Sequence, residues 1–510
     1  MEHTQRSTDA TDATDADRAM PDHLQLMTSG RGFVAVHVGA GLHANKNKVA
    51  YLEACKRACR AGTEMLRRNP QPSALSVVEY IVSILEDDPM TNAGLGSNLN
   101  LDGQVQCDAS IMNGSTLGFG SVGAVSDFRN PIQVASKVLQ ESDLGPLSLG
   151  RIPPIMLVGP GVTRWVETMG FDDLKRIQPT LSRENLLALK TEHEDTTGDL
   201  DKNRSQPIDK EDGIHASIAD SLITKRTLEQ HIGFQRLLEK SHQMQSNVSL
   251  SQINSGNATF ESGNSTVPES DSTSVLTKKR RRSISDDTAS NFDRLTFTRE
   301  MNSATENKDE DDILQDTVGA ICVDGFGRVA AGVSSGGIAL KFSGRVSEAA
   351  LFGAGCWAQD ASPSSEPTAP SSHGFACSMT GAGEQICKTL LARACADIFL
   401  QEDSLPVQEA AEFVLDKKFL KSPLLRSYPE KQAGFIAVRV EPPSSEDSTS
   451  GPQLSGPQPL GPLRAEFVFA HTTQTMGVAY MSTQDSKPTA TLSRRAADKN
   501  KAVFSRMVRL

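Results

Sequence analysis

Residues 315–320 read Gln315-Asp316-Thr317-Val318-Gly319-Ala320, and a long polar tract ends there as a strongly patterned strand begins. Thr317 opens this strand directly after an acidic residue. If the chain is cut before Thr317, the hydroxyl becomes a nucleophile and the freed α-amine becomes a base on the same residue. The alternative interpretation is an ordinary β-branched residue, because threonine is favoured in strands. The rest of the chain decides between the two.

The composition predicts one folded unit of about 300 residues with long polar segments outside it. The chain has 510 residues and a formal net charge of −11, which argues against direct binding of nucleic acid. No apolar run is long enough for a membrane span, and residues 1–27 lack the apolar core of a secretory signal. The 8 cysteines form no CxxC pair and most lie in apolar patterns, so we expect buried free thiols, no metal and no cofactor.

The order of patterned and polar segments predicts the domain organisation. We expect a disordered tail at 1–30, a first folded part at 31–190, a disordered low-complexity tract at 191–311 and a second folded part at 312–510. Within the polar tract lies the basic run Lys278, Lys279, Arg280, Arg281 and Arg282. Such a run is either a solvated stretch or a nuclear-import signal.

Hydrophobic periodicity predicts a mixed fold in which helices are segregated from antiparallel hairpins. The first part reads as strand 32–40, helices 48–68 and 74–86, strands 105–112 and 118–126, and a helix from Asn130-Pro131. The second part reads as a hairpin around Asp324-Gly325-Phe326-Gly327, helices 383–400 and 407–417, and strands 434–440, 463–470 and 475–481. This order favours an α+β fold, a four-layer αββα sandwich of two sheets between helices.

Polar residues after Thr317 are candidates for one site. If Ser335 and Thr317 lie at the same end of the hairpin, their hydroxyls face one pocket; otherwise Ser335 belongs to a simple turn. Arg345, in a glycine-rich loop, either clamps a substrate carboxylate or is solvated. Thr380 and the Gly381 N–H either face the oxyanion of an acyl-transfer intermediate or belong to a loop before a helix.

The loop TNAGLGSNLN at 91–100 is the last candidate. It lacks the GxxxxGK[ST] form of a phosphate-binding loop, so we do not expect nucleotide binding. We interpret Asn92 and Asn100 as internal hydrogen-bonding residues that shape one wall of the site, and we include Asn100 among the candidate substrate-binding residues.

Together these motifs resemble the N-terminal-nucleophile hydrolases of the plant-type asparaginase family. The resemblance rests on HVGAG (37–41), TNAGLGS (91–97), TVGA (317–320), SSGG (334–337), GRV (344–346), GAGC (353–356) and GAGE (381–384). Within the family, the chain is most similar to the threonine aspartases, or taspases, through CDASIMNG (107–114), GRIPP (150–154), SSGGIALK (334–341) and HTTQTMGVAYMSTQD (471–485). The likeness covers roughly 32–180 and 312–490.

The resemblance implies a precursor that cuts itself between Asp316 and Thr317. Fragments 1–316 and 317–510 would stay associated, with two such pairs forming a heterotetramer. Thr317 would be the nucleophile of a threonine-type endopeptidase, Ser335 would assist it, Arg345 would bind the substrate aspartate, and Thr380 with Gly381 would form the oxyanion side. The implied substrates are proteins cut after aspartate, notably nuclear chromatin and transcription regulators. The implied partner is an import receptor, and the implied location is the nucleus with a cytoplasmic fraction.

The first self-cleavage raises a chemical difficulty, because the nitrogen of Thr317 is still an amide and cannot act as the base. The family route is an N→O acyl shift, which needs strain at the scissile bond and a neighbouring polar group.

Other functions stay open at this stage. Asparaginase-type members carry an Asp that holds the α-amino group of a small substrate, where this chain has Glu348. The longer acid favours a site open to a protein chain, yet an asparaginase or isoaspartyl dipeptidase remains the alternative. The absence of a signal peptide disfavours a lysosomal glycosylasparaginase. An inactive fold that serves as a nuclear adaptor is the remaining hypothesis.

Overall fold

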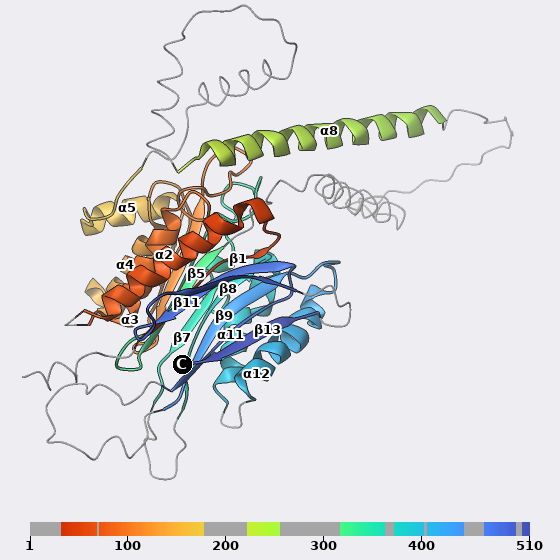
Figure 1. Ribbon diagram of the computed structural model, residues 1–510. Coiled ribbons are helices and arrows are strands. Elements are labelled where there is room, and N and C mark those ends of the chain that lie inside the picture. Colours follow the sequence, from red (N-terminus) through yellow and green to blue (C-terminus); the bar gives the residue numbers. More distant parts are fainter. Residues whose placement is uncertain are drawn as a thin grey trace, which may run out of the picture.

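The computed structural model describes residues 32–68, 71–177, 222–255, 317–362, 372–401, 405–442, 464–495 and 502–510, with the backbone alone at 244–255. Within these residues the predicted mixture of helices and sheets is confirmed (Figure 1). Two sheets, almost wholly antiparallel, account for every named strand. No helix in the described part is both long and apolar enough to cross a membrane.

The larger sheet has eight strands in the order β12-β11-β1-β5-β6-β2-β3-β4. Strands from before and after the predicted cut are interleaved in this order, because β1 lies between β11 and β5 while β6 pairs with β2. The strands are β1 (Phe33–Gly41), β2 (Cys107–Asn113), β3 (Phe119–Val125), β4 (Met156–Val158), β5 (Val318–Val323), β6 (Val329–Ser335), β11 (Thr475–Ser482) and β12 (Thr489–Arg494).

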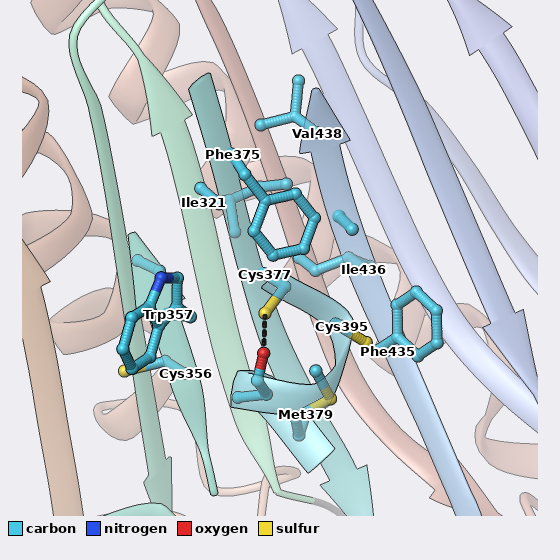
Figure 2. Close-up of a cluster of buried hydrophobic side chains, with 14 of the residues drawn as sticks. Ile321, Cys356, Trp357, Phe375, Cys377, Met379, Cys395, Phe435, Ile436 and Val438 are labelled. Atoms are coloured by element: carbon cyan, nitrogen blue, oxygen red, sulfur yellow. Dashed lines mark hydrogen bonds between the residues drawn. The ribbon is translucent and has the colours of Figure 1, made fainter. Parts of the chain in front are cut away.

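The smaller sheet has five strands in the order β13-β10-β9-β8-β7. They are β7 (Cys356–Gln359), β8 (Gly374–Gly381), β9 (Ala433–Val440), β10 (Ala465–His471) and β13 (Phe504–Arg509). Strands β1, β5 and β6 of the larger sheet contact β8 or β9 of the smaller one. A buried apolar cluster joins the two sheets, and Figure 2 shows Ile321 of β5 in it with Phe375 of β8 and Ile436 of β9.

Helices lie against each sheet (Figure 1). α2 (Lys48–Leu66), α3 (Ala74–Glu86) and α4 (Pro131–Asp143) contact the larger sheet, whereas α11 (Leu391–Phe399) and α12 (Val407–Phe413) contact the smaller one. Strand alternation explains how β1 serves both sides. Val34 and Val36 join the cluster under the helices, and Phe33 and Ala35 join the cluster between the sheets.

Short helices complete the fold. α5 (Pro160–Met169) follows β4, and α10 (Gly383–Thr389) follows β8. The single helix predicted over 383–400 is wrong in one respect. Leu390 has φ 44° and ends α10, so that α11 begins as a separate helix. The other short elements are 3-10 helices at Asn45–Asn47, Ser148–Gly150, Glu348–Ala350 and Pro423–Leu425 and a π-helix at Val414–Leu420.

Helix α8 (Lys225–Ser255) corrects the prediction of disorder for its own part of the tract 191–311. Leu228 and Ile232, one turn apart, are 4% and 6% exposed and join the cluster under the helices. Much of the remaining helix extends beyond the sheets (Figure 1). The other predictions for this tract, including Lys278–Arg282, lie outside the described residues, as does the tail at 1–30.

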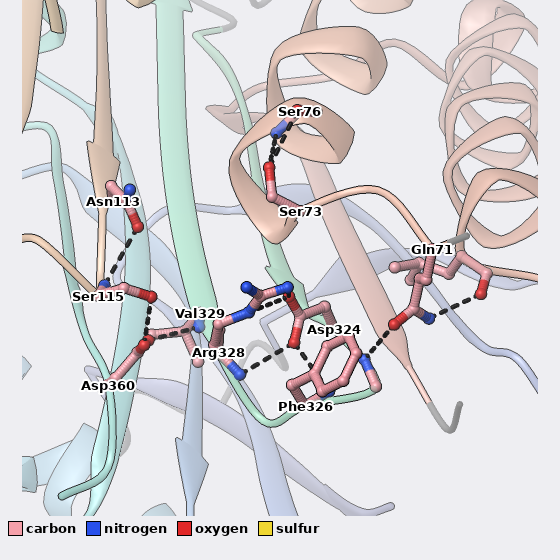
Figure 3. A network of polar contacts seen from close by, with 12 residues as sticks. Gln71, Ser73, Ser76, Asn113, Ser115, Asp324, Phe326, Arg328, Val329 and Asp360 are labelled. Atoms are coloured by element: carbon pink, nitrogen blue, oxygen red, sulfur yellow. Dashed lines mark hydrogen bonds and ion pairs between the residues drawn. The ribbon is translucent and has the colours of Figure 1, made fainter. Parts of the chain in front are cut away.

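Polar contacts fix the predicted hairpin between β5 and β6 (Figure 3). The buried carboxylate of Asp324 accepts from the N–H of Phe326 at 2.9 Å and of Arg328 at 3.1 Å, and from Arg328 Nε at 2.7 Å. Gln71, from the segment between α2 and α3, accepts from the N–H of Gly325 at 2.8 Å. This turn sets the register at the far end of the hairpin, where β5 begins and β6 ends.

The cysteines match their prediction. All eight are free thiols, seven of them buried and Cys387 half-buried.

Candidate active site

The hairpin register brings Thr317 and Ser335 together. Val318 pairs with Ser334, so Thr317 and Ser335 lie side by side at the end of the strands. Ile321 and Val333 belong to the cluster between the sheets, and alternation points Thr317 and Ser335 toward that same side. Thr317 Oγ1 lies 3.1 Å from Ser335 Oγ.

Glu348 is the third group at the hydroxyl of Thr317. Its Oε1 lies 3.3 Å from Thr317 Oγ1, and the residue is 1% exposed. A hydroxyl has one hydrogen to donate, and a carboxylate accepts more strongly than another hydroxyl. Thr317 is the donor in both contacts and can serve one acceptor at a time, so the Glu348 carboxylate is the stronger competitor for its hydrogen. Burial raises the pKa of Glu348 to about 7, and the neighbouring Arg345 opposes that rise.

Arg345 supplies a positive charge with a free edge. Its Nε and Nη2 donate to Glu384 Oε1 at 2.9 and 2.8 Å, and its side chain is 13% exposed. Nη1 is buried and has no hydrogen-bond partner among the described residues. A buried N–H without a partner is costly, so this edge is suited to an incoming carboxylate.

The three groups open on one small pocket, together with backbone from β8 and the loops that follow β6. Its lining residues are Thr317, Ser335, Gly337, Ile338, Arg345, Ser347, Glu348, Gly381 and Gly383. A nucleophilic hydroxyl, an acid and a free cationic edge in one pocket suit attack on a carbonyl whose substrate carries a carboxylate. Nowhere in the described ranges do three His, Cys, Asp or Glu side chains gather as a metal site.

Two candidate residues lie elsewhere. Thr380 is buried on β8 and its hydroxyl accepts from the N–H of Ala40 at 3.1 Å, so it ties the end of β1 to the smaller sheet and does not line the pocket. Asn100 is buried in a turn, where its side-chain oxygen accepts from the N–H groups of Asp102 and Gln104. Gly381 does line the pocket. Asp316 lies outside the described residues.

The loop at 91–100 forms hydrogen bonds to the glycines that follow Ser335, and Asn92 makes such bonds as the sequence predicts. Asn92 Nδ2 donates to the carbonyl of Gly337 at 2.9 Å, and its backbone carbonyl accepts from Gly336 at 2.7 Å. Asn98 Nδ2 donates to the same Gly337 carbonyl at 2.9 Å. These bonds hold the two glycines after Ser335 in place. The sequence reasoning missed Asn98.

His37 fixes the backbone of the nucleophile. Its Nδ1 lies 3.1 Å from the carbonyl oxygen of Thr317, and its Nε2 lies 2.9 Å from Ser378 Oγ. Burial lowers the pKa of His37 to about 3, so the ring is neutral and Nδ1 carries the hydrogen that the carbonyl accepts. A lone histidine in an otherwise apolar strand was the available signal for this role.

Asp108 helps to position Glu348, and the sequence reasoning did not identify it either. Its Oδ2 accepts from the N–H of Ser347 at 2.7 Å and its Oδ1 from the N–H of Ala124 at 2.8 Å. The carboxylate of Asp108 therefore anchors to β2 the loop that contains Arg345 and Glu348. The signal was the single charged residue of this strand.

Comparison with known proteins gives consistent matches. The family model described as asparaginase matches residues 31–220 and 242–441. The chain is 26% identical over 388 residues to a plant-type L-asparaginase of Thermococcus kodakarensis, covering 76% of this chain and 86% of that protein. It is 27% identical over 392 residues to an isoaspartyl peptidase/L-asparaginase of Mus musculus, covering 77% and 78%. It is 32% identical over 173 residues to an isoaspartyl peptidase of Escherichia coli, covering 32% and 49%.

Proposed function

This chain belongs to the asparaginase family of N-terminal-nucleophile hydrolases, and we propose that it is a self-processing threonine hydrolase that opens an amide bond at an aspartyl group. The observation that most directly supports this proposal is the position of the Thr317 hydroxyl between Ser335 and Glu348, beside the free edge of Arg345. A cut between Asp316 and Thr317 would free the α-amine as the base of the mature enzyme.

Two substrate classes share the required chemical unit. An aspartate in a protein chain has its main-chain carbonyl two carbons from its carboxylate. Asparagine and β-aspartyl peptides have their side-chain carbonyl two carbons from the α-carboxylate. In both classes Arg345 would hold the carboxylate while Thr317 attacks the carbonyl. The classes differ in the nitrogen bonded to Cα of the aspartyl group. In a protein chain this nitrogen is a neutral amide, whereas in the small substrates it is an ammonium beside the carboxylate.

We propose cleavage of proteins after aspartate as the main activity, as in the taspases. The sequence itself places Asp316 on the acyl side of the first bond that the site would open. The carboxyl of Glu348 is directed at Thr317, and with its pKa raised to about 7 it is partly neutral at neutral pH. A partly neutral acid is a weak partner for a substrate ammonium. The motifs shared with taspases support the same proposal.

Hydrolysis of asparagine or isoaspartyl peptides is the second candidate, and the names of the relatives support it. A structural observation favours it too. The Cβ of any side chain at Gly383 would lie 2.5 Å from Glu348 Oε2 and 2.8 Å from Arg345 Nη2, so the acid and the cation stand close together. Such a pair is suited to the ammonium and carboxylate of a free amino acid.

Mass spectrometry of the purified protein beside a Thr317→Ala variant tests the proposal. We expect two wild-type fragments, the second beginning at Thr317, and one intact variant chain. The processed protein is then offered a peptide with an internal aspartate, free asparagine and a β-aspartyl dipeptide. A kcat/KM at least tenfold higher for the internal-aspartate peptide supports the main proposal, and the reverse order selects the second candidate. A cut at another position would refute both.

We also propose the finer assignments that accompany this activity. The sheets and helices would form the four-layer αββα sandwich of the family, and the cut fragments would assemble as two αβ pairs. The substrates would be nuclear regulatory proteins. Lys278–Arg282 would bind an import receptor, giving a nuclear location with a cytoplasmic fraction. Replacing these five residues by alanine should move a fluorescent fusion to the cytoplasm, and an unchanged distribution would reject the import role.

A further inference from the structure

Self-cleavage needs a base that the mature enzyme does not need. In the uncut chain the nitrogen of Thr317 is acylated by Asp316, and an amide nitrogen does not accept a proton from a hydroxyl. Some other group within hydrogen-bond distance of Thr317 Oγ1 has to take the proton when the oxygen attacks. The contacts of this hydroxyl in the uncut chain therefore limit the choice.

Only two described side chains lie within hydrogen-bond distance of Thr317 Oγ1, Ser335 and Glu348. The oxygen of Ser335 already accepts from the N–H of Gly337 at 3.0 Å, and a neutral hydroxyl is a poor base. His37 reaches the carbonyl oxygen of Thr317 and has Ser378 at its second nitrogen. Arg345 is a cation and cannot accept a proton.

We propose that Glu348 is the general base of self-cleavage, a role confined to the uncut chain. This inference rests on the proposed function. The Glu348 carboxylate takes the proton of the Thr317 hydroxyl as Oγ1 bonds to the carbonyl carbon of Asp316. The tetrahedral intermediate collapses, the C–N bond breaks, and the leaving nitrogen receives that proton from Glu348. The product is an ester with a free α-amine, and water hydrolyses it to release the Asp316 carboxylate and restore the Thr317 hydroxyl.

The position of Glu348 suits a base that works once. It is 1% exposed, so bulk water does not compete for its carboxylate. The charged and titratable groups facing it are Arg345 from its own loop, Asp108 from β2 and Cys387 from α10. Arg345 stabilises its charged form, whereas burial and Asp108 oppose it and raise its pKa to about 7. Burial raises the pKa of Cys387 to about 12, which keeps that thiol neutral.

The test follows precursor loss in full-length chains made by cell-free translation, in the wild type and in Glu348→Gln. Glutamine keeps the side-chain size and removes the basic carboxylate. We expect self-cleavage to slow at least about 100-fold, the usual contribution of a general base, with no fall in the melting temperature. Glu79→Gln is the matched control, because Glu79 is a half-buried acid of α3 that bonds Ser136 away from the pocket. It should cleave at the wild-type rate.

A pH profile separates a base from a structural role. Because the carboxylate is the active form, the wild-type rate should rise about tenfold per pH unit below 7 and level off above it, and this rise should be absent from Glu348→Gln. Glu348→Gln cleaving at the wild-type rate, or a flat wild-type profile from pH 5 to 9, would overturn the proposal. The profile decides even if the variant does not fold. Failure of the wild type to cut at Thr317 would instead count against the proposed function.

Discussion

The ring of His37 holds the backbone of Thr317, with Nδ1 3.1 Å from the carbonyl oxygen. The histidine belongs to β1 and the threonine precedes β5, 280 residues later. A residue from the first part of the chain thus orients the residue that opens the second part. Because the ring is buried and neutral, it acts through hydrogen bonds and not through charge.

We predict that His37→Ala slows self-cleavage about tenfold and lowers the free energy of unfolding by about 1–3 kcal/mol, the usual cost of an unpaired buried polar group. Ser378→Ala removes the outer contact of the ring and the hydrogen bond from Ser378 to the Gly332 carbonyl, but it leaves the Nδ1 contact in place and should slow self-cleavage less than His37→Ala does. Gel assays of precursor loss and denaturant unfolding give the two values. Equal effects of the two variants would contradict a direct role for Nδ1.

Arg345→Ala should reduce kcat/KM of the processed protein by about 100-fold or more, because a buried charge-assisted pair with the substrate carboxylate is lost. Arg345→Lys keeps the charge without the planar fork and should recover only part of the loss. Steady-state kinetics on the preferred substrate measures both. Arg393→Ala serves as the control, because Arg393 is half-exposed and pairs with Asp397 on α11. If Arg345→Ala were as active as this control, the carboxylate would be held elsewhere.

Glu86 makes the stability of the protein depend on pH. It is fully buried at the end of α3, its Oε1 accepts from the N–H of Ile132 at 3.0 Å, and burial raises its pKa to about 8. An acid with a raised pKa contributes stability below its unfolded value near 4.5 and loses it as the pH rises to about 8. Glu86→Gln should therefore gain stability over the wild type by up to about 1.4 kcal/mol per pH unit in this window.

Denaturant unfolding at pH 5, 7 and 9 measures this gain. Glu64→Gln changes an exposed acid on α2 and should follow the wild type at every pH. A constant difference between Glu86→Gln and the wild type would show that Glu86 is already charged in the folded protein.

Local sequence patterns predicted most of the frame of this site. The Asp324-Gly325-Phe326-Gly327 turn signal indicates a hairpin, and the hairpin alone brings Thr317 and Ser335 side by side. Arg345 was identified from its glycine-rich loop together with the family motifs. Such inferences succeed because the contacts are short in sequence or because the motif carries the geometry.

The missing contacts join distant parts of the chain. Asp108 holds Ser347 across 239 residues, and Asn98 reaches Gly337 across 239 residues. No periodicity within either segment indicates its partner. The same limit explains the position of Thr380. It directly precedes Gly381, which lines the pocket, but its hydroxyl accepts from the N–H of Ala40. It also explains why α8 was not predicted, since the burial of Leu228 and Ile232 depends on packing against distant parts of the chain.

The interleaved strand order of the larger sheet determines how the cut protein could refold. After the cut before Thr317, β1 would belong to the first fragment and would lie between β5 and β11 of the second fragment. The uncut chain refolds in a first-order process at any dilution. The denatured cut protein would have to rebuild the same sheet by collision of two separate chains, with second-order kinetics. Cutting would then make recovery from denaturation depend on protein concentration, whereas the first folding, in the precursor, does not depend on it.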